Sequence, residues 1–132
     1  MALSLAEHPI HLGLGLGGRA VSQPAFTGVE WYEDYANRTA ADGAEGRLVV
    51  LHTFTADWES WERHPAGEEV VVCVSGAIAL HQELADGSTA TVDLGPGEYA
   101  INPPGVWHTA DIAREATCLF ITAGLGTENR PR

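Results

Sequence analysis

Short apolar runs separated by turn residues fill the chain after Gly46, and this pattern limits the fold more than any other feature of the sequence. The runs are rich in Val, Ile, Leu, Thr and aromatic residues, and they span residues 48–55, 69–74, 78–83, 89–94, 98–101, 108–112 and 117–122. Glycine, proline and aspartate separate them, and Asp86-Gly87 has the form of a tight hairpin turn because both residues tolerate positive φ. Short strands at this spacing are typical of an antiparallel sandwich or barrel. We therefore predict an all-β fold.

The first 45 residues differ from this pattern. Residues 1–28 are rich in Gly and Leu, and residues 12–18 resemble a phosphate-binding glycine loop only superficially, because no Lys-Ser or Lys-Thr closes it. We interpret this segment as an arm that lies against the barrel or crosses to a second subunit. Residues 31–41 are predicted to form one short helix, because Trp31 and Tyr35 share a face. The predicted organisation is an arm and helix packed on the barrel in residues 1–45, a barrel in residues 46–125 and a C-terminal tail in residues 126–132.

Charge and composition exclude several classes of partner. The chain has 132 residues and a formal net charge of -11, from 18 Asp and Glu against 7 Lys and Arg. So few cations cannot form a basic patch for nucleic acid or for an anionic membrane surface. No apolar run approaches the ~18 residues of a membrane span, and we expect a cytoplasmic protein. Cys73 and Cys118 lie in apolar runs and are predicted to be buried thiols.

Two stretches of the chain carry side chains that can bind a metal. Glu62 and His64 are two residues apart, so they face the same way if that segment is extended. The turn at residues 65–67 brings the chain back, so that Glu69 can lie beside His64. The Pro-Pro-Gly turn at residues 103–105 then delivers His108 at the start of a strand. Two imidazoles and a carboxylate suit a divalent first-row transition metal.

The spacing of these residues resembles the two sequence motifs of the cupin superfamily. In the first motif, four residues separate His64 from Glu69, and six separate Glu69 from Gly76. The second motif is matched by residues that fit its spacing without a gap: Gly97, Pro103, Gly105 and His108. The resemblance covers about residues 46–123. It implies a small double-stranded β-helix, or jelly-roll barrel, with metal ligands lining its interior.

The chain departs from these motifs at three positions. Glu62 stands where the family has its first histidine, Ile112 replaces an asparagine and Ala56 replaces a glycine. The implied ligand set is Glu62, His64, Glu69 and His108. Without Glu62, the other three residues leave open positions that suit Fe(II); with it, a second oxygen ligand favours Fe, Mn or Zn over Cu(I). The alternatives for Glu62 are that it points away from the metal, binds a water or serves as a general base.

Other polar and aromatic residues receive weaker assignments. The spacing to Gly76 favours Glu69 over Glu68 as a ligand, and Glu68 is predicted to face solvent. Among the remaining histidines, His52 could face the cavity but is predicted to be a surface or packing residue, His81 is predicted to be solvated, and His8 and His11 in the arm are given no role. Trp61 and Trp107 alternate with Glu62 and His108 and are predicted to face outward. Three further aromatic residues are candidates for the cavity wall: Phe54, Tyr99 and Phe120.

Three functional hypotheses follow from the resemblance. The first is a metal-dependent enzyme that acts on a small molecule in the barrel, with dioxygenase or isomerase-type chemistry. The second is a non-catalytic module that binds a small metabolite, and the third is a metal-free structural homodimer. The resemblance also implies that the protein is a homodimer under any of these hypotheses. The acidic composition disfavours a highly anionic substrate.

Overall fold

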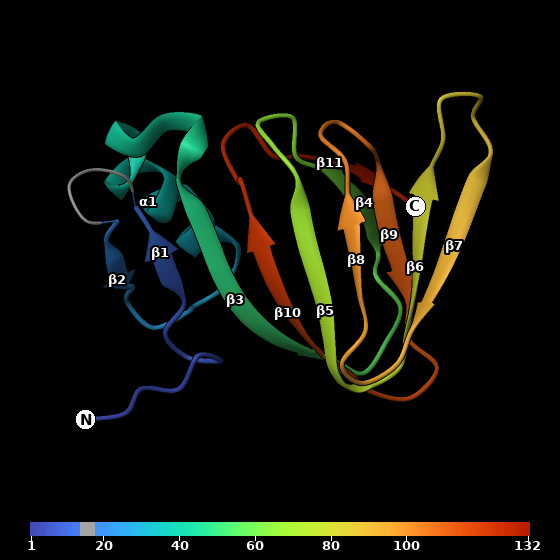
Figure 1. Ribbon diagram of the computed structural model, residues 1–132, viewed down its shortest axis with the longest axis horizontal. Helices are drawn as coiled ribbons and strands as arrows, with labels where there is room; N and C mark the ends of the chain where they lie inside the picture. The colour runs from blue at the N-terminus through green and yellow to red at the C-terminus, as the bar shows by residue number, and fades with distance from the viewer. Residues whose placement is uncertain (14–17) are drawn as a thin grey trace.

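The computed structural model describes residues 1–13 and 18–132, so part of the glycine-rich stretch, residues 14–17, lies outside the described residues. Two antiparallel sheets form the barrel (Figure 1). The six-stranded sheet has the order β2-β1-β3-β10-β5-β8, and the five-stranded sheet has the order β11-β4-β9-β6-β7. The strands are β1 Ile10–Leu12, β2 Ala20–Ser22, β3 Arg47–Phe54, β4 Ser60–Arg63, β5 Glu69–Gly76, β6 Ile78–Glu83, β7 Thr89–Leu94, β8 Tyr99–Asn102, β9 His108–Asp111, β10 Ala116–Thr122 and β11 Glu128–Pro131.

All seven predicted runs are strands, with ends that differ by no more than two residues from the prediction. Their alternating side chains form the core between the sheets. Every second residue is buried along β10 and in β5 as far as Cys73, which places Val71, Cys73, Cys118 and Phe120 inside. Each large apolar side chain that is fully buried in this way contributes roughly 1.5–3 kcal/mol. The two cysteines face each other across β5 and β10 as free thiols, as expected.

Gly76 ends β5 at a point where only glycine fits. Its φ is 77°, and an added Cβ would lie 2.0 Å from the carbonyl oxygen of Glu115. Gly87, in the β6–β7 hairpin turn, has a similar φ of 84° but open space around the Cβ position. The two glycines therefore share the conformational requirement and differ only in steric room.

We expect Gly76→Ala to destabilise the fold much more than Gly87→Ala. Gly87→Ala should cost about 1–2 kcal/mol, the price of a left-handed backbone for a residue with a Cβ. Gly76→Ala adds a clash with backbone, which can be relieved only by moving the β9–β10 connection. Urea denaturation of both variants measures the difference, and equal losses of unfolding free energy would contradict the steric argument.

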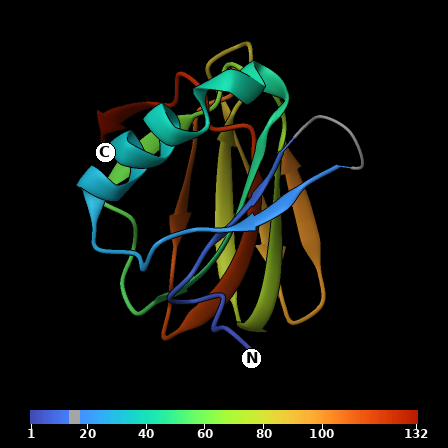
Figure 2. The same cartoon turned by 90° about the vertical axis from the view of Figure 1, so that its left-hand side faces the viewer.

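The N-terminal elements gather at one end of the molecule (Figures 1 and 2). Strand β1 pairs antiparallel with both β2 and β3, so this segment lies against the barrel of its own chain. Helix α1, Val29–Arg38, is followed by a short 3-10 segment, η1 Ala40–Glu45, so the regular helix is shorter at its C-terminal end than predicted. Trp31 and Tyr35 are buried on one face of α1 with their rings stacked 5.5 Å apart, as the four-residue spacing predicted.

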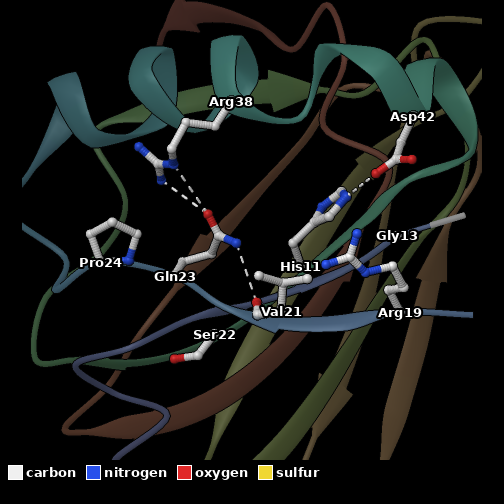
Figure 3. Close-up of a pocket in the computed structure, with 9 residues that line it drawn as sticks. All are labelled: His11, Gly13, Arg19, Val21, Ser22, Gln23, Pro24, Arg38 and Asp42. Atoms are coloured by element: carbon white, nitrogen blue, oxygen red, sulfur yellow. Dashed lines mark hydrogen bonds and ion pairs between the residues drawn. The ribbon is translucent and has the colours of Figure 1, made fainter.

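His11, which received no role from the sequence, ties the hairpin to the helical segment (Figure 3). Its ring is 4% exposed, and its two nitrogens lie 2.6 Å from the Tyr35 hydroxyl and 2.6 Å from Asp42 Oδ2. Nearby, the Arg38 guanidinium donates to the Gln23 side-chain oxygen. A buried imidazole with both nitrogens bonded is a structural link between β1, α1 and η1.

The residues predicted to be a C-terminal tail contain a strand, because Glu128–Pro131 pairs with β4. This strand has no apolar alternation, so its sequence carries no strand signal. It is held partly by side chains on the outer surface, where Arg130 stacks on Trp61 and Trp107. Trp107 also lies under Arg63, 4.5 Å from its guanidinium carbon. Both tryptophans therefore face outward, as predicted.

Candidate metal centre

The structure brings the four predicted side chains together inside the barrel. Each of Glu62, His64, Glu69 and His108 offers one ligand atom, and these atoms all lie within 4.8 Å of one another. Glu62 is on β4 and pairs in register with His108, the first residue of β9. His64 follows β4, and Glu69 begins β5 in the other sheet. The cluster therefore lies where the two sheets face each other.

Both imidazoles point their Nε2 atoms at both carboxylates. His64 Nε2 lies 3.1 Å from Glu69 Oε2 and 3.4 Å from Glu62 Oε1. His108 Nε2 lies 3.2 Å from Glu69 Oε1 and 3.2 Å from Glu62 Oε1. His64, Glu69 and His108 are buried, whereas the Glu62 side chain is 28% exposed. Glu62 is thus the member of the cluster that faces the entrance.

Hydrogen bonds to the Nδ1 atoms orient both histidines. His108 Nδ1 lies 3.3 Å from the Val106 carbonyl oxygen, which can only accept, so Nδ1 carries a proton. His64 Nδ1 lies 2.8 Å from Thr127 Oγ1, whose own hydrogen is donated to the Gly124 carbonyl. His64 Nδ1 is therefore a donor as well. This arrangement leaves both Nε2 lone pairs available for a metal, as in histidine ligands generally.

Polar residues on neighbouring strands hold the Glu69 carboxylate in place. Asn102 Nδ2 donates to Glu69 Oε1 over 3.0 Å, and Thr122 Oγ1 donates to Glu69 Oε2 over 2.6 Å. Gln82 in turn donates to Asn102 Oδ1 over 2.8 Å. Sequence reasoning missed these three residues and Thr127. Thr122 was detectable in principle, because it is a polar residue at an inward position of β10, whereas Thr127 lies in a turn without any signal.

The cluster also shifts the pKa values of its own members. Burial lowers the pKa of His64 and His108, but the adjacent Glu62 and Glu69 carboxylates outweigh it and raise both pKa values to about 9. Burial raises the pKa of Glu62 and Glu69, but the two adjacent imidazoles outweigh it, and both pKa values fall below their usual range. Two imidazolium ions and two carboxylates then give a net charge of zero.

The residues present fit a divalent metal ion. His64 Nε2 is buried and makes no hydrogen bond with any described residue, although two carboxylate oxygens lie within 3.4 Å. A buried nitrogen aimed at oxygens without hydrogen-bonding geometry is suited to share a cation with them. Replacing two protons with one divalent ion keeps the net charge at zero. Two nitrogen and two oxygen donors suit Fe, Mn or Zn.

A cavity of about 720 Å³ connects the cluster to the surface. Glu62, His64 and Glu69 line its inner part, and helix α1 and strand β3 line its outer part. His52 packs against aromatic rings, 5.2 Å from Phe26 and 6.1 Å from Phe54, and it also lines the cavity, so the packing prediction and the cavity-facing alternative both hold. Phe54 and Phe120 line the cavity as predicted, whereas Tyr99 is 64% exposed and lies outside it.

The other weak assignments have mixed outcomes. Glu68 is exposed and Glu69 is buried, as predicted. His81 is not simply solvated: its Nδ1 bonds Thr91 Oγ1 and its Nε2 lies 2.8 Å from Asp111 Oδ2, both on strands that flank β6.

A second pocket of about 330 Å³ lies beside the N-terminal hairpin (Figure 3), and its buried polar side chains His11 and Gln23 already have partners. The larger cavity is therefore the candidate functional site.

No helix in the described part of the chain has the length and apolar character that crossing a membrane requires.

Comparison with known proteins shows what this chain is similar to. Over 68 residues the chain is 34% identical to acireductone dioxygenase of Rhodopseudomonas palustris strain TIE-1, and equally so to that of a second strain. The match covers 46% of this chain and 40% of the relative, so the chain matches less than half the length of these curated relatives.

Two solved structures share the fold. An uncharacterized conserved protein with a double-stranded β-helix domain from Klebsiella pneumoniae superposes with a TM-score of 0.53 and 21% identity, over 65% of this chain and 76% of that chain. Oxalate oxidase superposes with a TM-score of 0.54 and 14% identity, over 61% of this chain and 44% of that chain. At these identities the likeness concerns the fold alone.

The family model described as "Cupin domain" matches residues 50–124, which is more than half of the chain. The match begins within β3 and ends just after β10, so it spans the strands that carry all four clustered side chains. With two antiparallel sheets closed around that cluster, this chain belongs to the cupin family.

Proposed function

We propose that the protein is a metal-dependent enzyme that binds one Fe, Mn or Zn ion through Glu62, His64, Glu69 and His108 and acts on a small molecule in the cavity. The observation that carries the proposal is the position of the four donor atoms, all within 4.8 Å of one another at the inner end of a cavity of about 720 Å³. A ligand-sized cavity that ends on a cluster of titratable groups is the usual form of an active site.

The reaction class we propose is oxygen-dependent oxidation of the bound molecule, with isomerisation as the alternative that needs no oxidant. Support comes from the match to acireductone dioxygenase, whose name describes oxygen chemistry. When bound, the metal would supply Lewis acidity and, as Fe or Mn, redox chemistry. The cavity wall would exclude water through residues such as Phe54, Trp58 and Phe120.

Glu62 is proposed to serve both the metal and the substrate. Its Oε1 lies among the two Nε2 atoms, whereas its Oε2 makes no hydrogen bond with the described residues. The side chain is the most exposed of the four and lines the cavity. One oxygen can therefore bind the ion while the other accepts a proton from a substrate hydroxyl.

A metal-free structural role is the competing candidate, and a specific observation favours it. The same distances that suit a metal, 3.1–3.4 Å between imidazole nitrogens and carboxylate oxygens, also suit ion pairs between protonated histidines and ionised glutamates. The cluster can then stabilise the barrel without any ion. Metal analysis separates the two candidates.

The test is metal content followed by turnover. Protein purified without an affinity tag or chelator is expected to hold a transition metal or to take up about one equivalent on reconstitution. The Fe(II)-loaded protein should then consume oxygen with a member of a panel of enediols, catechols and hydroxy acids, while the redox-inert Zn(II)-loaded protein should not. Less than about a tenth of an equivalent after reconstitution would leave the structural candidate. Full metal loading without turnover, by oxygen uptake or by isomerisation, would leave a non-catalytic binding module.

Glu62 variants test its place in the metal site. Glu62→Gln removes a charged oxygen ligand and is expected to weaken metal binding by about tenfold or more. Glu62→His places a histidine at the family's usual position and is expected to restore binding. If both variants match the parent in a competition assay with a chelator, Glu62 is not a ligand.

A further inference from the structure

The wall of the cavity is apolar and aromatic over most of its area. Its outer part is built from one side of helix α1 and from alternate residues of β3, with β10 and the turn after it completing the wall. The large apolar and aromatic residues that line it include Tyr32, Val50, Phe54, Trp58, Phe120 and Leu125. Such a wall favours apolar ligand surface, at roughly 25 cal/mol for each Å² removed from water.

No arginine or lysine lines this cavity among the described residues. The chain contains no lysine, and its seven basic residues are all arginine. None of them contributes to the wall. Most have partners elsewhere: Arg38 bonds Gln23, Arg63 bonds Glu128, Arg130 bonds Glu83 and Arg132 bonds Asp111.

The charge at the inner end of the cavity also disfavours an anionic ligand. Glu62 and Glu69 place two carboxylates at the inner end, enough to balance a divalent ion, so the loaded cluster offers no excess positive charge. Asp57 and Glu59 also line the cavity and add negative charge toward its mouth. An anionic ligand would therefore enter a partly desolvated site without a counter-ion, at a cost that an uncharged ligand avoids.

The polar groups on the outer wall are uncharged. The Tyr32 hydroxyl on α1 lies 3.1 Å from His52 Nε2 on β3, so this pair joins the helix to the sheet within the cavity. Burial, followed by the charges of Glu62 and Glu69, raises the pKa of Tyr32 to about 12. Burial lowers the pKa of His52, which keeps the imidazole neutral near pH 7. The pair can bond a hydroxyl or carbonyl group but cannot neutralise an acid.

We propose, on the premise of the metal-dependent function above, that this cavity binds an uncharged, predominantly apolar compound with its hydroxyl or carbonyl oxygens directed at the cluster. The apolar wall of α1, β3 and β10 contacts the apolar part of this compound, and the absence of any arginine or lysine discriminates against carboxylates and phosphate esters. The ligand class is thus set by the wall and not by the metal.

A matched pair of ligands tests this selectivity. The compounds 4-tert-butylcatechol and 3,4-dihydroxybenzoate carry the same vicinal hydroxyls and differ at the opposite ring position, where one has an apolar group and the other a carboxylate. Calorimetric titration into Zn(II)-loaded protein, and into metal-free protein, is expected to show about tenfold or more tighter binding of 4-tert-butylcatechol in both forms. Oxalate, a small dianion, is expected to bind more weakly than either.

A variant at the mouth tests the cause of the selectivity. Leu125 lines the cavity and is 51% exposed, so Leu125→Arg adds a cation with little risk to folding. This variant is expected to tighten 3,4-dihydroxybenzoate by about tenfold and to leave 4-tert-butylcatechol nearly unchanged. Leu125→Gln, which is polar but uncharged, is the matched control and should change neither affinity in this way.

The outcomes separate this proposal from the proposed function. Equal binding of the two compounds, tighter binding of the carboxylate, or no binding of 4-tert-butylcatechol would overturn the ligand class, even if the protein is fully metal-loaded. Preference for 4-tert-butylcatechol in protein that takes up no metal would support the selectivity of the wall while the metal-dependent function fails.

Discussion

Replacing His108 with alanine is expected to abolish metal binding and to destabilise the barrel. His108 is 0% exposed, and its Nε2 lies 3.2 Å from an oxygen of each carboxylate. The variant loses one of two nitrogen ligands, and metal affinity should fall by about 100-fold or more. In the metal-free protein the carboxylates lose one of their two positive partners. Breaking a buried charge pair from one side costs about 3–5 kcal/mol.

Two further variants make this result interpretable. His81→Ala removes a histidine that also pairs with a carboxylate, Asp111 at 2.8 Å, but outside the cluster. It is expected to leave metal uptake unchanged. His108→Gln retains a polar side chain of similar reach and should fold better than His108→Ala while still binding metal weakly. Metal analysis by mass spectrometry, with circular dichroism as a check on folding, measures all three; full metal uptake by a folded His108 variant would remove this residue from the site.

Metal binding is expected to release about two protons for each ion near pH 7. In the metal-free protein the pKa of both His64 and His108 is about 9, because Glu62 and Glu69 stabilise the imidazolium forms. A bound metal requires both Nε2 atoms to be deprotonated. Metal affinity should therefore rise by about 100-fold for each pH unit between about pH 6 and about pH 8, and level off above about pH 9.

Calorimetry in buffers with different ionisation enthalpies measures the released protons directly. Competition with a chelator at several pH values measures the slope of affinity against pH. A slope near zero after correction for the chelator would mean that the histidines are already neutral in the metal-free protein, and the charge-balanced cluster would then be wrong.

The same pKa shifts determine how the stability of the metal-free protein depends on pH. The raised pKa of His64 and His108 stabilises the fold fully below the unfolded value of about 6.5, and this contribution is lost as pH rises toward about 9. The lowered pKa of Glu62 and Glu69 stabilises the fold above about pH 4.5 and is lost as pH falls further. Stability should therefore be greatest between these limits, and a metal should reduce the loss at high pH.

Much of the barrel was predictable because its signals are local. The two-residue alternation of β5 and β10 follows from strand geometry, and residues adjacent in sequence carry it in full. The choice of Glu69 over Glu68 rested on spacing alone, and Glu69 is the buried residue of the two. In contrast, β11 was interpreted as a tail, because its pairing with β4 depends on a partner 65 residues away.

The contacts around the candidate site could not be predicted from local sequence patterns. His52 was interpreted as a surface or packing residue because the sequence does not show that α1 lies opposite it, with Tyr32 in hydrogen-bonding distance. The support of Glu69 by Asn102 and Thr122 joins residues that are 33 and 53 positions from it. Such contacts depend on how strands pair and how the sheets close.

The sequence by itself determined the strands, the turns and the four side chains with the spacing of a cupin metal site, since each is set by local geometry or by a short motif. Only the tertiary structure decided that Glu62 faces both imidazoles, that polar partners orient the ligands, and that no arginine or lysine lines the cavity. These properties arise where residues from both sheets and from helix α1 meet, and their physical cause is long-range packing. The distances among the four side chains therefore rest on the closure of the barrel rather than on any one stretch of chain.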